Sequence, residues 1–142
     1  MDKEAFIAMI CHTSTAGIMK NYKYVVVLSF CNGKILLSRK RNQSTWETQG
    51  GHIELGESPL EAAKRELYEE SGALEYDIEP VCDYWAEDAE GFSIGYGMAF
   101  RSEIYNIGPI PDSEMEEVGL FSELPKELSY PDITPVLFER VK

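Results

Sequence analysis

Basic residues are scarce in this chain. Lysine and arginine together number 13, against 25 aspartate and glutamate residues, so the 142 residues carry a formal net charge of −12. A surface of that sign repels polyanions, which excludes broad electrostatic binding to nucleic acid or to anionic membranes. A phosphorylated substrate would have to be met by metal ions and a few local cations.

Cysteines and long apolar runs are also few. The three cysteines (Cys11, Cys31 and Cys82) are widely spaced and include no C-x-x-C pair, which argues against a disulfide or a zinc site. The longest apolar run covers residues 24–30, far short of the roughly 20 residues that span a bilayer. The first residues lack the basic-then-apolar plan of a signal peptide. We therefore expect a cytoplasmic protein without a membrane segment.

The length suits one domain, residues 1–142. Asn32-Gly33 between two β-rich runs is a strong hairpin signal. Strands are predicted at residues 24–30, 34–38, 46–49, 74–85, 92–105 and 117–121, and helices at residues 59–71 and 132–140. Residues 1–20 are ambiguous and favour a strand with a loose loop at 13–17. This order of elements suggests a mixed sheet between helices, an α/β (α+β) fold.

The boundaries of the first helix have local signals. Ser58 is a suitable N-cap, Pro59 suits the first helical position, and Glu61 completes a capping box. Gly72 accepts the left-handed conformation that ends many helices. The helical period places Leu60, Ala63 and Leu67 on one stripe, which should pack on the core.

Three glutamates, Glu66, Glu69 and Glu70, lie beside that stripe. At spacings of three and four residues they form like-charge pairs, each destabilising by a few tenths of a kcal/mol. One interpretation is a solvated acidic face. The other is a binding site for Mg²⁺ or Mn²⁺, because both ions prefer hard oxygen ligands.

A longer pattern surrounds these glutamates. Residues 51–73 read G-x5-E-x7-R-E-U-x-E-E-x-G-U, where U is aliphatic, and seven fixed positions match: Gly51, Glu57, Arg65, Glu66, Glu69, Glu70 and Gly72. This resembles the signature of the Nudix hydrolases, which cleave diphosphate bonds in nucleoside diphosphates linked to a further group. The resemblance implies an α/β/α sandwich with a mixed central sheet and a loop-helix-loop metal site.

The resemblance also implies roles for individual residues. Glu66, Glu69 and Glu70 would be metal ligands together with a main-chain carbonyl, for which Gly51 is a candidate. The general base is a helix glutamate in some relatives, here Glu69 or Glu70. In others it comes from a later loop, where Glu114 and Glu116 are candidates and a solvated acidic turn is the competing interpretation.

Arg65 and Glu57 suit a supporting role. An arginine presents a fixed fork of donors that can hold a carboxylate in one orientation, so Arg65 is expected to brace Glu57 or a ligand glutamate.

Substrate contacts are less defined. Arg39, Lys40 and Arg41 could meet the outer phosphates, although a solvated turn is the favoured interpretation. Five aromatic residues could stack on a nucleobase, although most such residues only pack in the fold: Trp46, Tyr84, Trp85, Phe92 and Tyr96.

The sequence also departs from the family pattern. Gln49 stands where many relatives have proline, Thr48 replaces a large apolar residue, and Ala73 is small for the last aliphatic position. No subfamily marker is found, and a homodimer is left open.

The expected function is metal-dependent hydrolysis of a diphosphate bond in a small nucleoside diphosphate-linked substrate, for example by a (deoxy)nucleoside triphosphate pyrophosphohydrolase. The alternative is a Nudix-like domain that binds a nucleotide or sugar nucleotide as a sensor without turnover. A non-hydrolytic relative, such as an isopentenyl diphosphate isomerase, is less favoured, because such an enzyme is longer and has its own catalytic residues.

Overall fold

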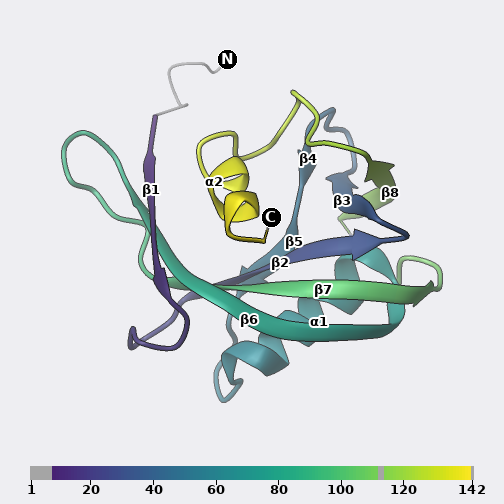
Figure 1. Ribbon diagram of the computed structural model, residues 1–142, viewed down its shortest axis with the longest axis horizontal. Coiled ribbons are helices and arrows are strands. Elements are labelled where there is room, and N and C mark those ends of the chain that lie inside the picture. Colours follow the sequence, from purple (N-terminus) through teal and green to yellow (C-terminus); the bar gives the residue numbers. More distant parts are fainter. Residues whose placement is uncertain (1–7, 112–113, 142) are drawn as a thin grey trace.

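A computed structural model describes residues 8–111 and 114–141 (Figure 1). It contains one eight-stranded sheet and two α-helices. The strands are β1 (Ile10–Thr15), β2 (Tyr24–Cys31), β3 (Lys34–Lys40), β4 (Trp46–Glu47), β5 (Gln49–His52), β6 (Ala73–Glu87), β7 (Gly97–Ile107) and β8 (Met115–Phe121). The helices are α1 (Pro59–Ser71) and α2 (Thr134–Phe138), and a 3₁₀ turn follows at Glu139–Val141. No helix of this described part is long and apolar enough to cross a membrane.

The sheet is mixed and it forks. Its main order is β1-β6-β7-β2-β3-β4, and the β2–β7 pair is parallel. Strand β2 changes its partner on one side, because Tyr24–Val27 pair with β5 whereas Ser29–Cys31 pair with β3. The fork lets β5 leave the plane of β3 and run beside α1.

The two helices cover opposite faces of the sheet (Figure 1). On one face α1 contributes the buried side chains Ala62, Ala63 and Leu67. On the other face Leu137 and Phe138 of α2 pack in a second cluster. The predicted α/β/α layering and mixed sheet are confirmed.

The bounds of α1 follow the predicted signals. Ser58 Oγ accepts from Glu61 N at 3.1 Å, and Glu61 Oε1 accepts from Ser58 N at 2.9 Å. Gly72 closes the helix with φ of 80°, and a Cβ there would lie 2.4 Å from the Gly108 carbonyl oxygen. The prediction for Leu60 is wrong, since its side chain is exposed and Ala62 is buried instead.

Three other predicted bounds need correction. The strand expected from residue 92 begins at Gly97, because Asp88 Oδ1 accepts from the main-chain N of Glu90 and Phe92 and closes a turn there. The C-terminal helix is shorter than residues 132–140 and ends in the 3₁₀ turn. The run at 46–49 is split between β4 and β5. The N-terminal strand is present as β1, and residues 1–7 lie outside the described residues.

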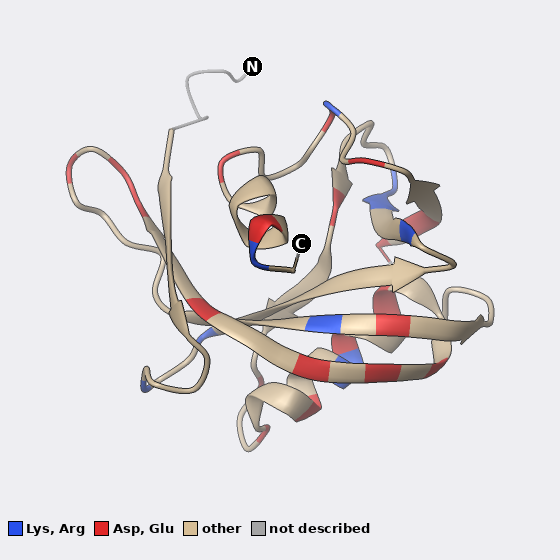
Figure 2. Ribbon diagram, viewed as in Figure 1, with Lys and Arg blue, Asp and Glu red and all other residues tan. Residues whose placement is uncertain are grey.

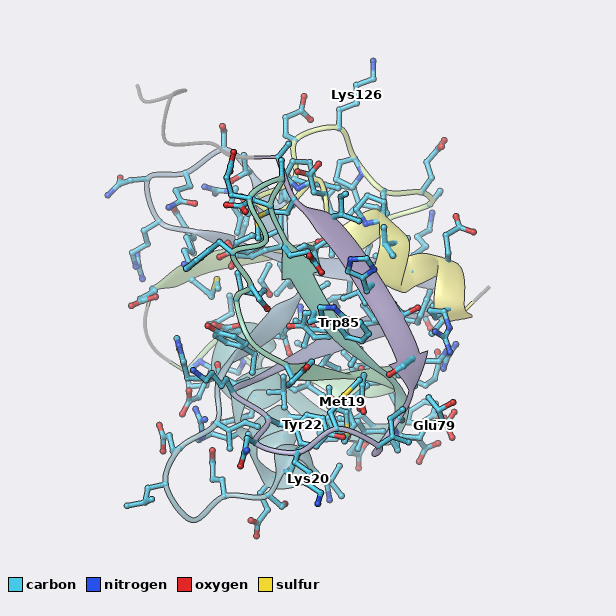
Figure 3. All side chains as sticks on the ribbon, turned by 90° about the vertical axis from the view of Figure 1, so that its left-hand side faces the viewer. Met19, Lys20, Tyr22, Glu79, Trp85 and Lys126 are labelled. Atoms are coloured by element: carbon cyan, nitrogen blue, oxygen red, sulfur yellow. The ribbon has the colours of Figure 1, made fainter. Side chains whose placement is uncertain are left out.

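Strand β6 is longer than its outer neighbour. β1 pairs only with Cys82–Glu87, so residues 74–81 have no outer strand partner among the described residues. The buried Asp83 lies one residue from the end of this pairing. Its carboxylate accepts four hydrogen bonds of 2.9 Å, from the main-chain N of Gly17, Ile18 and Met19 and from the Tyr22 hydroxyl. The chain therefore turns away after β1, and Figure 3 shows Met19 and Tyr22 on this side of the molecule, below Trp85.

Candidate active site

A cavity of about 1230 Å³ lies where α1 and β5 meet the ends of β3 and β4. Acidic side chains of its lining are Glu47, Glu54, Glu66, Glu69, Glu70 and Glu114, and its cations are Lys40, Arg41 and Arg65. Apolar and aromatic side chains also line it, among them Tyr24, Val26, Tyr84, Ile94 and Leu137. The cavity therefore combines charged groups with a wall on which a flat ring could pack.

Arg65 organises the carboxylates of this site. Its guanidinium binds Glu57 with two bonds, Nε to Oε2 at 2.6 Å and Nη2 to Oε1 at 3.0 Å. Its Nη1 donates to Glu66 at 3.0 Å and to Glu69 at 3.4 Å, and Nη2 also reaches the His52 carbonyl at 3.1 Å. These contacts with Arg65, helped by a backbone bond at Glu54, lower the pKa of Glu57 to about 2. The guanidinium thus ties the loop before α1 to the helix.

Glu66 is the buried acid of α1, and Glu70 is half-buried. Glu70 Oε1 accepts from the main-chain N of Gly50 at 2.9 Å. Burial raises the pKa of Glu70 to about 8, against the opposing effect of that hydrogen bond, and burial also raises the pKa of Glu66. Glu69 is exposed. A cation placed among these groups would therefore replace protons or Arg65 contacts.

The two glycines of β5 allow this close approach. A Cβ on Gly51 would lie 2.4 Å from Glu66 Oε2, and a Cβ on Gly50 would lie 2.3 Å from the Val25 carbonyl oxygen. A larger residue at position 51 would displace the Glu66 carboxylate, and one at position 50 would clash with the backbone of β2. Glycine is required here by space.

The acids are arranged around Arg65 and Gly50. Among residues 8–111 and 114–141, no three acidic, histidine or cysteine side chains converge into a ready-made metal cluster. The available donors are carboxylate and carbonyl oxygens, which are the hard ligands that Mg²⁺ and Mn²⁺ prefer. The residues therefore fit such an ion, which would compete with Arg65 for Glu66 and Glu69.

Of four further predicted residues, two line the cavity and two lie outside its lining. Glu114 and Arg41 line the cavity, whereas Glu116 and Arg39 are absent from its lining and pair with each other at 3.6 Å. Arg39 also binds Glu117 and the Gln43 carbonyl.

Neither tryptophan lines the cavity. Trp46 packs edge-on against Phe121 at 4.9 Å, and Trp85 stacks on His12 at 5.3 Å.

Sequence reasoning missed Glu47. This buried carboxylate lines the cavity, accepts from Ser129 Oγ at 3.1 Å and lies 4.0 Å from Lys40 Nζ. Burial raises its pKa, and Lys40 opposes that shift. Alternation along β3 and β4 would have put both side chains on the cavity side, but only with the strand register known.

The curated relatives match a short part of the chain. RNA pyrophosphohydrolase of Francisella tularensis subsp. mediasiatica is 34% identical over 56 residues, which are 39% of this chain and 36% of that protein. RNA pyrophosphohydrolase of Vibrio cholerae is 36% identical over 62 residues, 42% of this chain and 36% of that protein. The matches span about a third of the length of these relatives.

Solved structures share the fold over most of the chain. A mutant form of the Bacillus subtilis pyrophosphohydrolase BsRppH superposes with a TM-score of 0.74 at 22% identity, covering 94% of this chain and 89% of that one. A UDP-X diphosphatase gives 0.66 at 22% identity, covering 88% and 63%. The family model of the NUDIX domain matches residues 20–128. Because this match includes the signature and most of the sheet, the chain belongs to the NUDIX domain family.

Proposed function

We propose that this protein is a metal-dependent hydrolase that cleaves a diphosphate bond in a nucleotide. The observation that carries the proposal is the placement of Glu66 beside Gly51 and of Glu70 at the main-chain N of Gly50, with Glu69 in the lining of the same cavity. A divalent cation bound there would neutralise phosphate charge and lower the pKa of an attacking water. The site then offers what hydrolysis of a phosphoanhydride requires.

The residues of the chain supply the remaining steps. Arg65 holds Glu57 and the loop before α1, so that the helix carboxylates keep their positions. Glu69, Glu70 and Glu114 are the candidates for the general base, because each lines the cavity and Glu116 does not. A base of this kind contributes about 10²–10⁴-fold to a rate.

The cavity supports a nucleotide as substrate. Its volume of about 1230 Å³ exceeds the roughly 300–1,000 Å³ of typical ligand pockets, which leaves room for a nucleoside and several phosphates. We assign the nucleobase to the wall formed by Tyr24, Tyr84 and Ile94. The phosphates are assigned to the side of the cavity that carries Lys40 and Arg41. The net charge of −12 favours a small nucleotide in the cytoplasm over a long nucleic acid.

The names of the curated relatives point to a second substrate, the 5′ end of an RNA. A direct screen separates these cases: nucleoside triphosphates, deoxynucleoside triphosphates, nucleotide sugars and a 5′-triphosphorylated oligoribonucleotide are each incubated with Mg²⁺ or Mn²⁺. We expect metal-dependent formation of product, at a rate that Glu70→Gln lowers by about 10²-fold or more. Nucleotide binding without turnover under any of these conditions would instead support the sensor alternative.

A further inference from the structure

Four polar side chains lie wholly buried at the fork of the sheet, outside the cavity lining. Each has 0% exposure and each comes from a different strand: Ser102 of β7, Ser29 of β2, Gln49 of β5 and Ser38 of β3. We call this set the Gln49 network. Polar groups at such depth are costly unless every one of them is hydrogen-bonded.

The network forms a one-way series of hydrogen bonds. Ser102 Oγ donates to Ser29 Oγ at 2.9 Å, and Ser29 Oγ donates to Gln49 Oε1 at 2.6 Å. Gln49 Nε2 donates to Ser38 Oγ at 2.9 Å, and Ser38 Oγ donates to the main-chain carbonyl of Glu70 at 2.8 Å. Bonds arranged head to tail polarise and strengthen one another. The series ends on one of the acids of the candidate active site.

The end of the series meets a helix terminus. The last four carbonyls of a helix lack intrahelical partners, and Glu70 is the second-last residue of α1. Ser38 supplies the partner for its carbonyl, while the Glu70 carboxylate accepts from Gly50 N at 2.9 Å. Gly50 directly follows Gln49 in β5, so one short segment controls both attachments of Glu70.

We propose that Gln49 is a positioning residue of this site, which fixes the C-terminal turn of α1 through Ser38 and so holds the Glu70 carboxylate at Gly50. The need to fill space where the sheet branches does not by itself explain these polar side chains, because apolar side chains of similar shape would fill it without hydrogen-bond partners. What Glu70 then does rests on the proposed function. Its attachment to Gly50 does not, because both contacts form within the chain.

Variants that cut the series at different points test the inference. Ser38→Ala removes the last link, Gln49→Met replaces the central amide by an apolar side chain of similar length, and Ser102→Ala removes the far end. The double variant Ser38→Ala/Gln49→Met shows whether Gln49 acts through Ser38. Cys82→Ala, a buried change in the core cluster on the α2 side of the sheet, controls for a loss of stability alone.

Two measurements are made on each protein. Hydrogen exchange of the Gly50 amide, compared with amides of β7, reports the Glu70 contact without metal, and calorimetry gives the dissociation constant for Mg²⁺. We expect faster Gly50 exchange and about tenfold weaker Mg²⁺ binding in Ser38→Ala and Gln49→Met, as is common when groups that orient metal ligands are removed. The double variant should bind Mg²⁺ no more weakly than Ser38→Ala, and Ser102→Ala should have the smallest effect.

The inference is overturned if Gly50 exchange and Mg²⁺ affinity stay at the wild-type level in both single variants, or if Cys82→Ala changes them equally. The proposed function can fail separately. A wild-type protein that does not bind Mg²⁺, but whose Gly50 exchange still responds to Ser38→Ala and Gln49→Met, would refute the metal site and leave the positioning role intact.

Discussion

Replacing Arg65 by lysine keeps the positive charge but removes the planar guanidinium with its several donors. The guanidinium makes five hydrogen bonds, two to Glu57 and one each to Glu66, Glu69 and the His52 carbonyl. A lysine ammonium has three donors on one nitrogen and cannot match the bidentate geometry. At least two bonds must therefore be lost.

The size of the effect follows from those contacts. A hydrogen bond to a charged group contributes about 1.5–3 kcal/mol, but the Arg65 side chain is 22% exposed and Glu69 is 50% exposed, so solvent screens part of this. We expect Arg65→Lys to lose about 2 kcal/mol of stability, or about 4–8 °C in Tm. Since Arg65 also orients the helix carboxylates, Mg²⁺ affinity should fall about tenfold or more.

Thermal unfolding with and without Mg²⁺ measures both quantities. Arg101→Lys is a matched control, because Arg101 contacts Glu103 at 3.3 Å and the ring of Phe30 at 4.5 Å away from the cavity. This control should lose no more than about 1 kcal/mol and bind Mg²⁺ normally. An Arg65→Lys protein with wild-type Tm and Mg²⁺ affinity would refute the bracing role.

Further outcomes are expected. Glu70→Gln should lower hydrolysis by about 10²-fold or more while the fold survives, which circular dichroism and steady-state rates would show. Asp83→Asn should lower the free energy of unfolding by about 3 kcal/mol, because the amide NH₂ would face a backbone N–H. Denaturant unfolding measures this loss, and Asp77→Asn, an exposed change on the same strand, is the control. The pKa of Glu57 is lowered to about 2 from 4.5. The contribution of the Glu57 carboxylate to stability is therefore complete above pH 4.5 and is lost as pH falls toward 2. The free energies of unfolding of wild type and Glu57→Gln, followed by acid titration, should converge near pH 2.

Local signals predicted the region around α1 well. Ser58, Glu61 and Gly72 act through bonds to residues nearby in sequence, so their spacing is enough to define the helix. The start of β7 was missed because Asp88 closes a turn through its side chain, which the β-rich run after it hides. The family, the layers and the mixed sheet were predicted correctly from the signature and the element order.

Contacts between distant strands could not be read from the sequence. Arg39 and Lys40 are neighbours, yet only Lys40 lines the cavity, and which one does so depends on the pairing of β3 with β4 and β8. Gln49 has partners on β2 and β3 that lie 20 and 11 residues away. Such a residue is visible only as a departure from the family pattern. The roles of the predicted ligands stay predictions until metal binding is measured.

Residues 74–81 of β6, which have no outer strand partner in the described part of the chain, bear on how the protein behaves at high concentration. An uncovered strand edge is a template for pairing with other molecules, and proteins protect such edges with charge, proline and bulges. Acidic residues recur at every second position of this stretch, as Glu75, Asp77 and Glu79 (Figure 2). Pro80 lacks a backbone donor, and the register with β7 shifts around Glu75 and again between Pro80 and Cys82. Electrostatic repulsion between molecules should therefore keep the sheet from extending into fibrils, and acid or high salt, which remove that repulsion, should promote self-association before the core unfolds.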